Sequence, residues 1–299
     1  MSCSKNPRVL SIQSHVVSGY VGNKSATFPL QLLGFEVDAI NSVQLSNHTG
    51  YKVFKGQVLD DSDLENLVTG LSENNLDNYT HLLTGYIGSV SFLKRVASLV
   101  NDLKAKNPNL IYVCDPVMGD NGKMYVPEEL TDIFKNEIVP LADILTPNYF
   151  ELELLTGRKT DSIEELLKGV KELHEKGPEI IAISSTKVLD QNDKLMGIVS
   201  SVKDESILKI DIPLIPVSYT GSGDLFAALF LAHIHLEGNI KDAIEKTINT
   251  LRAVLLKTFK HYESRKETGE QLAQKIELHL IQSKKEIENP PRHLIAQPL

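Results

Sequence analysis

Short apolar runs alternate with stretches of helical spacing in the part of the chain that ends at Ser185. The apolar runs are rich in Val, Ile and Leu, which is typical of buried strands. The stretches between them repeat apolar residues every three or four positions, which predicts amphipathic helices. The expected strands are 8–14, 35–43, 81–86, 110–116, 142–148 and 179–185. The expected helices are 24–34, 64–75, 91–107 and 162–177.

This alternation of strand and helix predicts a mainly parallel sheet with helices on both faces, a three-layer α/β/α sandwich. The pattern changes after Ser185, where 195–202 and 207–215 are β-rich runs separated by a charged turn, so we expect an antiparallel hairpin. After Asp224 the chain reads as almost wholly helical, through 225–236, 243–259 and 269–287. We see no repeat or flexible linker, and we expect one domain over 1–299 with an irregular tail from about residue 285.

Two helix starts carry capping signals. Ser162 followed by Glu165 forms the pattern of a capping box at the start of a helix. Asn148 followed by Glu151 offers the same pattern just after the strand 142–148. For the second pair a functional interpretation stays open beside the structural one, because both side chains also lie next to a strand end.

Composition and charge narrow the class of protein. Of 299 residues 41% are hydrophobic and 23% charged, which is ordinary for a globular protein. The 31 basic and 39 acidic residues give a net charge of -8, which argues against a nucleic-acid partner. Only Cys3 and Cys114 are present, so we expect a reducing compartment and a buried Cys114. The chain shows neither a signal-peptide pattern nor a membrane-spanning run, so we expect a cytoplasmic protein without a membrane partner.

Several polar residues fall at or just past the carboxyl ends of the expected strands. Open parallel sheets bind ligands beyond these ends, so residues far apart in the sequence should share one edge. They are Ser14, Tyr86, Asp115, Thr146, Asn148 and Ser184.

The most informative segment is "TGSGDLFAALFLAH", from Thr220 to His233. Gly221 and Gly223 leave the first helical N–H groups open to an anion, and the apolar helix behind them predicts a central position. Asp224 is then either a first-turn capping residue or a general base that accepts a proton from a substrate hydroxyl. We expect the helix dipole to lower the pKa of Asp224 and keep it ionised.

Further carboxylates follow the next strands. Asp115 and Asp120 in "CDPVMGD", with Glu151, are interpreted either as loop and capping residues or as a site for polyphosphate and Mg²⁺. Taken alone, Ser14 and Thr49 are more often turn residues than ligand contacts, and His15 and His48 are explained equally well as local hydrogen-bonding residues. No Cys and His spacing suggests zinc, and no P-loop motif is present.

Taken together, these segments resemble the pyridoxal kinase family of the ribokinase superfamily, over most of the chain to about Leu280. The glycine-rich turn alone would indicate only the superfamily, whereas the first two segments separate this family from sugar kinases. The segments are "RVLSIQSHVVSGYVGN", "ATFPLQLLGFEVDAINSVQLSNHTGY", "LLTGY", "YVCDPVMGD", "MYVPEEL", "PLADILTPNYFELELLTGR" and "TGSGDLFAA".

The resemblance implies a ribokinase-like fold and transfer of the γ-phosphate of ATP to the 5'-hydroxyl of pyridoxal, pyridoxine or pyridoxamine. It implies that Asp224 is the catalytic base and that Gly221, Ser222 and Gly223 form an anion hole. It implies vitamin contacts at Ser14, Thr49 and Tyr86. It also implies a divalent cation such as Mg²⁺, often K⁺, and a homodimer. The implied ATP and cation residues are Asp115, Asp120, Tyr125, Thr146, Asn148, Glu151, Ser184, Ser185, Ser222 and Gly223.

The sequence also departs from the family. The segment 118–129, which resembles the lid over the phosphates, is shorter than in many animal relatives. Residues 187–213 cannot be matched one by one, and Ser222 stands where relatives often have Thr. Two alternatives remain open: a kinase for hydroxymethylpyrimidine or a sugar, and a silent protein that binds nucleotide or vitamin. The intact Asp224 argues against the silent protein.

Overall fold

A ten-stranded sheet forms the centre of the computed structural model, which describes residues 6–186 and 194–299. Its strand order is β12-β11-β10-β9-β8-β5-β4-β1-β2-β3. The strands from β9 to β2 run parallel, whereas β3, β10, β11 and β12 pair antiparallel with their neighbours. The bounds are β1 Arg8–Val16, β2 Glu36–Leu45, β3 Gly56–Val58, β4 His81–Thr84, β5 Ile111–Cys114, β8 Ile144–Leu145, β9 Ile180–Thr186, β10 Lys194–Ser201, β11 Ser206–Pro213 and β12 Gln297–Pro298.

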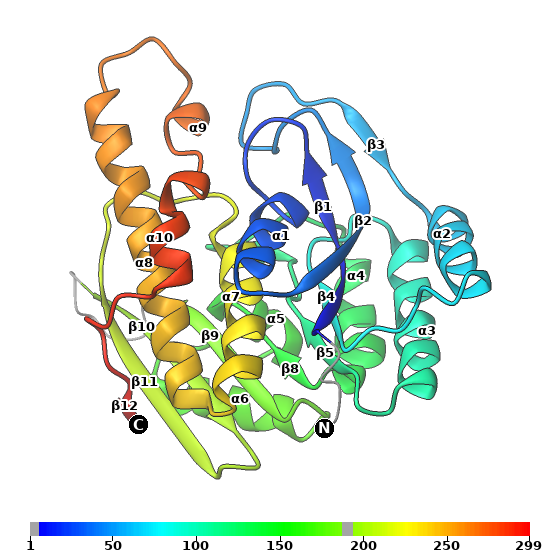
Figure 1. The fold of residues 1–299 in the computed structure, drawn as a ribbon. Coiled ribbons are helices and arrows are strands. Elements are labelled where there is room, and N and C mark those ends of the chain that lie inside the picture. The colour runs from blue at the N-terminus through cyan, green and yellow to red at the C-terminus, as the bar shows by residue number, and fades with distance from the viewer. Residues whose placement is uncertain (1–5, 187–193) are drawn as a thin grey trace.

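Helices cover both faces of this sheet, so the predicted three-layer sandwich is confirmed (Figure 1). One apolar core lies under α1 Asn23–Leu32, α7 Ser222–Glu237, α8 Ile240–Ser264 and α10 Lys284–Glu288. The other core lies under α2 Asp61–Glu73, α3 Val90–Lys106, α4 Glu129–Ile133, α5 Tyr149–Thr156 and α6 Ile163–His174. Cys114 is fully buried, as its apolar run predicts.

The central position of α7 follows from its composition. Every residue from Leu225 to His233 is buried, so this helix has no solvent-facing side over that stretch. It packs between α1 and α8 and contacts β5. Its N-terminus lies at the end to which the arrowheads of β1 and β2 point, the carboxyl edge of the parallel strands (Figure 1). None of the helices in the described ranges is long and apolar enough to cross a membrane.

The second half agrees with the prediction at the hairpin and differs at the C-terminus. The pair β10 and β11 is the expected antiparallel hairpin. The expected helix over 269–287 is wrong: the segment forms α9 Leu272–Lys275, a 3-10 turn at Ile281–Ser283 and the start of α10. Tertiary contacts end α9, because the Glu277 carboxylate accepts from Tyr20 N and the Thr258 hydroxyl accepts from His279 N. The tail is irregular over 289–296 but adds β12 to the sheet.

The helix-capping predictions have different outcomes. At α6, Ser162 accepts from Glu165 N, but the Glu165 carboxylate binds Arg158 and Lys168 instead of closing the box. At α5 both halves of the box between Asn148 and Glu151 are present. The second half of the box predicted at Ser162 is wrong, because two cations bind this half-buried carboxylate more strongly than a single backbone N–H would.

Candidate active site

The register of the parallel strands brings most of the predicted site residues to one edge of the sheet. Ile12 pairs with Thr84, Thr84 with Cys114, and Cys114 with Leu145. Leu145 then pairs with Ile181. The predicted edge residues follow this row, with Ser184 farther along β9: Ser14, Tyr86, Asp115, Thr146, Asn148 and Ser184. Ser185, which only the resemblance implies, adjoins Ser184.

The glycine-rich turn opens onto this same edge. Gly221 caps α7 with φ 84°, a left-handed conformation that favours glycine, and no side chain caps the helix. A Cβ on Gly221 would lie 2.1 Å from the Tyr20 carbonyl oxygen, so this position tolerates no side chain. Ser222 donates from its Oγ to the Tyr219 carbonyl at 3.3 Å, and Gly223 is exposed. The first-turn N–H groups of α7 are therefore available to an anion.

Asp224 lies half-buried in the first turn of α7. Burial raises the pKa of its carboxyl, and a hydrogen bond from the Gly22 N–H opposes this only in part. The prediction that the helix dipole lowers this pKa is therefore wrong in direction, because the loss of solvation outweighs the dipole. A raised pKa makes Asp224 a better proton acceptor once it is ionised.

Gly22 connects Asp224 to Ser14. It has φ 52°, and a Cβ there would lie 2.0 Å from the Ser14 carbonyl oxygen and 2.4 Å from Ser14 Oγ. The Gly22 N–H that binds Asp224 thus adjoins Ser14, which is 8% exposed. The sequence "GYVGN" contains Gly22, but nothing in its spacing marked it as a site residue.

Thr49 and Tyr86 border the same region. Thr49 is exposed in the loop after β2, and a Cβ on the adjacent Gly50 would lie 3.9 Å from Thr220 Oγ1. This loop therefore faces the glycine-rich turn. Tyr86 is half-buried after β4, its carbonyl accepts from Ser42 Oγ at 2.6 Å, and burial raises the pKa of its phenol.

Asp115 stands on the other side of the turn. It is 4% exposed, its Oδ2 is buried with no hydrogen-bond partner, and that atom lies 3.9 Å from the place of a Cβ on Gly223. Burial raises the pKa of Asp115 well above its ordinary value, and the carboxylates of Glu151 and Asp224 add to the rise. A hydrogen bond from Thr146, which is also buried, acts in the opposite direction.

Glu151 is held by backbone donors. One carboxylate oxygen accepts from Met118 N at 2.9 Å and Gly119 N at 3.5 Å, and the other accepts from Asn148 N at 2.9 Å. Burial still raises the pKa of Glu151 to about 8. The capping role of Glu151 is thus confirmed, and the same carboxylate fixes the loop that carries Asp120.

That loop contains a small hairpin, β6 Gly119–Asp120 and β7 Lys123–Met124, which the sequence pattern did not reveal. Asn148 Nδ2 donates to the Gly119 carbonyl at 2.7 Å and ties the hairpin to the start of α5. Tyr125 follows the hairpin and is 52% exposed, and burial with the Asp120 charge raises its pKa. The hairpin stands beside the two buried carboxylates.

Cation binding fits some of these residues. The described residues contain no group of three or more His, Cys, Asp or Glu side chains arranged for a metal. Mg²⁺ needs only one or two protein carboxylates when substrate oxygens and water complete its shell. The unpartnered buried oxygen of Asp115 fits such a ligand, whereas the Glu151 oxygens already accept from backbone N–H groups.

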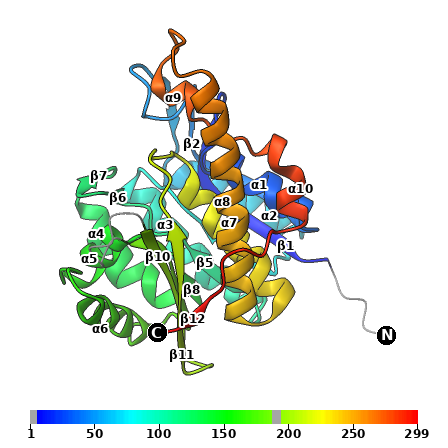
Figure 2. The same ribbon diagram turned by 90° about the vertical axis from the view of Figure 1, so that its left-hand side faces the viewer.

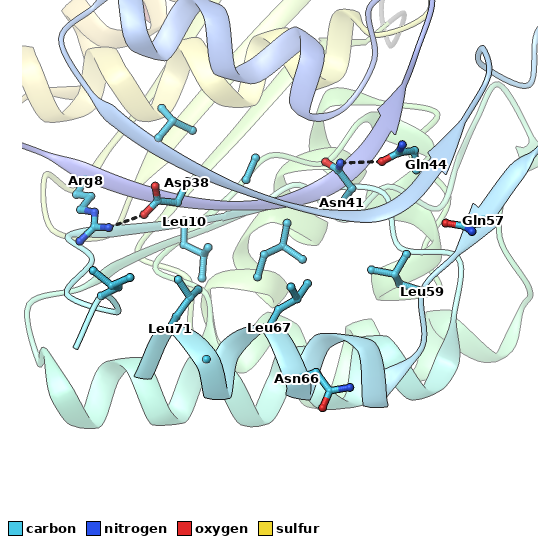
Figure 3. Close-up of a pocket in the computed structure, with 15 residues that line it drawn as sticks. Arg8, Leu10, Asp38, Asn41, Gln44, Gln57, Leu59, Asn66, Leu67 and Leu71 are labelled. Carbon is cyan, nitrogen blue, oxygen red and sulfur yellow. Dashed lines mark hydrogen bonds and ion pairs between the residues drawn. The ribbon is translucent and has the colours of Figure 1, made fainter. Parts of the chain in front are cut away.

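One groove lies away from this edge, and part of one segment discussed above lies outside the residues that the structure describes. A groove of about 730 Å³ lies between α2 and the strands β1 and β2, with the Arg8 and Asp38 ion pair at one end (Figure 3). It contains none of the predicted site residues. Of the segment 187–213, whose adenine contacts the sequence left vague, residues 187–193 lie outside the described ranges.

An open helix N-terminus with a carboxylate in its first turn, at the edge of a mainly parallel sheet, suits a small-molecule kinase, and the comparisons with known proteins establish this class and its ribokinase-like fold. The phosphomethylpyrimidine kinase family model matches residues 39–268. Pyridoxal kinase of Ovis aries is 48% identical over 298 residues, covering 95% of this chain and 96% of the relative. Pyridoxal kinase of Arabidopsis thaliana is 49% identical over 300 residues, covering 98% and 95%.

A solved structure agrees with these relatives. Pyridoxal kinase from Leishmania donovani, in complex with ADP and pyridoxamine, superposes with a TM-score of 0.90 at 33% identity, covering 98% of this chain and 100% of that one. The chain belongs to the pyridoxal kinase family.

Proposed function

We propose that this protein transfers the γ-phosphate of ATP to the 5'-hydroxyl of pyridoxal, and also of pyridoxine and pyridoxamine. Relatives named for this activity cover nearly the whole chain, and related structures hold ADP with pyridoxamine or pyridoxine. The single observation that carries the proposal is the position of Asp224. It lies in the open first turn of α7, between Ser14 on one side and Asp115 on the other.

Asp224 acts as the base in this account. Its carboxylate accepts the proton of the substrate hydroxyl as the hydroxyl oxygen attacks the phosphorus. The N–H groups at Gly221, Ser222 and Gly223 stabilise negative charge on the transferring phosphoryl group, because they lie at the positive end of the helix dipole and donate hydrogen bonds to that group. The Gly22 N–H orients the carboxylate of Asp224.

The acceptor side is formed by Ser14, Thr49 and Tyr86. Ser14 and Thr49 offer hydroxyls that suit the polar atoms of a pyridine ring, and Tyr86 offers an aromatic face. Support comes from the adjacency of Ser14 to Gly22 and of the Thr49 loop to Thr220.

The donor side comprises Asp115, Thr146 and the residues around α5. Asp115 would hold a divalent cation such as Mg²⁺, with Thr146 and Asp120 nearby and Glu151 fixing the loop. A bound Mg²⁺ supplies neutralisation of phosphate charge. Asn148, Ser184 and Ser185 would face ATP, and Tyr125 would close over the phosphates. We also propose K⁺ dependence, a homodimer and a cytoplasmic location, all of which follow from the family resemblance and the sequence.

A coupled assay for ADP production tests the function. Pyridoxal, pyridoxine and pyridoxamine are compared with hydroxymethylpyrimidine and ribose, with and without K⁺ and with Mg²⁺ or Mn²⁺. We expect turnover with the three vitamers. Turnover only with hydroxymethylpyrimidine or ribose would establish a different kinase, and binding without any turnover would establish a silent protein.

A further inference from the structure

A carboxylate near the C-terminus ties together the two loops that border the acceptor side. Glu277 follows α9, far in sequence from these loops, and its side chain is 17% exposed. Figure 1 and Figure 2 show α9 beside the loops that follow β1 and β2. One loop runs from Val17 to Gly22, and the other carries Thr49.

Three donors converge on Glu277. Its Oε2 accepts from Tyr20 N at 3.0 Å, in the first loop. Its Oε1 lies 3.1 Å from His48 Nε2 and accepts from the Tyr51 hydroxyl at 3.0 Å, in the second loop. A Cβ on Gly19 would lie 2.3 Å from Oε1, so the first loop packs directly against the carboxylate. A single carboxylate thus fixes the separation of the two loops.

The hydrogen bond at the other ring nitrogen of His48 selects its tautomer. Nδ1 accepts from Gly50 N at 3.1 Å, so the proton of the neutral ring is on Nε2, which donates to Glu277. His48 is 5% exposed, and its ring packs edge-on against Tyr51 at 4.9 Å. All three groups that face Glu277 are therefore donors, which only an ionised carboxylate satisfies completely.

Both loops also touch the glycine-rich turn. The Tyr20 N–H donates to Glu277, and the Tyr20 carbonyl oxygen lies 2.1 Å from the place of a Cβ on Gly221. Gly50, bound by His48, faces Thr220. A shift of Glu277 would therefore move the acceptor side relative to the turn that we assign to the phosphate.

We propose that Glu277 is a positioning residue for the alcohol substrate, which holds the loops of Tyr20 and Thr49 at the distance from Gly221 that the acceptor requires. This inference rests on the proposed function. Glu277 does not touch the reacting atoms in this account; it acts through the Tyr20 peptide and through His48.

The substitution Glu277→Gln tests the inference, because it keeps the shape and replaces one acceptor oxygen with a donor. Turned toward Tyr20, the new NH₂ group meets an N–H. Turned toward His48, it meets Nε2–H, and a change of tautomer would break the bond from Gly50 N. We expect the KM for pyridoxal to rise about tenfold, as for the loss of one or two charge-assisted hydrogen bonds, while the KM for ATP changes less than about twofold.

Glu286→Gln is the matched control, because Glu286 pairs with Lys257 on the α8–α10 side, away from both loops. It should leave both KM values unchanged. Tyr51→Phe removes one donor and keeps the ring, so it should raise the KM for pyridoxal about two- to threefold even if Glu277→Gln fails to fold. Melting temperatures are measured for every variant.

Unchanged KM values for pyridoxal in Glu277→Gln and Tyr51→Phe, or a parallel rise for ATP, would overturn the inference. The inference would also be overturned if kcat fell only as much as the fraction of folded protein falls, since that result would mean a merely structural role for Glu277. The wild-type enzyme separates the two proposals. If it turns over none of the vitamers, the proposed function fails and the inference fails with it. If the wild type turns over and the variants keep its KM for pyridoxal, only the inference fails.

Discussion

The carbonyl oxygen of Tyr20 lies 2.1 Å from the position that a Cβ on Gly221 would occupy. This contact joins the loop after β1, which borders the acceptor side, to the turn that begins α7. Gly221 also adopts φ 84°, which side chains rarely adopt. Two independent constraints therefore require glycine at this position.

The substitution Gly221→Ala should lower kcat by about 10²-fold or more, because the turn must move and its N–H groups lose their aim at the phosphoryl group. Gly238→Ala is the matched control at the other end of α7. Gly238 has φ 67° but no atom within 4 Å of an added Cβ, so it should cost only about 1–2 kcal/mol of stability and leave kcat unchanged. Steady-state kinetics and thermal melts distinguish these outcomes, and equal kinetic losses in both variants would refute the role of the contact.

Asp115→Asn should stabilise the metal-free protein while it impairs catalysis. The buried carboxylate has an unpartnered oxygen, so its removal should raise the free energy of unfolding at pH 8 by about 1–3 kcal/mol. The pKa of Asp115 is higher in the folded state than in the unfolded state, so its carboxylate destabilises the fold more as pH rises above the unfolded-state pKa. The gain in stability from Asp115→Asn should therefore be smaller at pH 5 than at pH 8.

Denaturant titrations of metal-free protein at the two pH values measure this gain. Asp143→Asn is the control, because Asp143 accepts from Tyr112 N at 2.7 Å and Lys104 Nζ at 3.0 Å and should lose stability. A loss of stability in Asp115→Asn at pH 8 would show that its carboxylate is stabilised by contacts that the account lacks.

The acid side of the pH profile should report Asp224. Burial raises its pKa above the ordinary value of 3.8, and a base works only when ionised. As pH falls through the folded pKa, log(kcat/KM) for pyridoxal should therefore decline with a break above 3.8. Circular dichroism over the same range controls for unfolding. Activity that stays level down to that ordinary value in folded protein would contradict the raised pKa.

The sequence predicted which residues lie at the carboxyl edge of the sheet better than it predicted the contacts that these residues make there. Asn148 and Glu151 were recognisable because a capping box is local, with its partners three residues apart. The same rule failed for Glu165, because Arg158 and Lys168 compete for its carboxylate. A local sequence pattern shows which hydrogen bonds a segment can form within itself, whereas its tertiary partners decide which of these bonds form in the folded protein.

The contacts that the sequence could not reveal join distant segments. Glu277 meets Tyr20 and Tyr51 only after folding, and this contact ends α9 where helical spacing predicted a longer helix. The raised pKa of Asp224 was missed for the same reason, since burial depends on the whole fold while the helix dipole can be read locally. The role of Gly22 could not be predicted either, because it depends on both the strand register and the position of α7.

The kcat of Asp224→Asn with saturating pyridoxal and MgATP tests the central claim most directly. The account predicts a fall of at least about 10²-fold with pyridoxal binding mostly kept, because a positioned base contributes on that scale and the amide keeps the shape. Turnover like that of the wild type in a folded Asp224→Asn variant would contradict it and remove Asp224 from the mechanism.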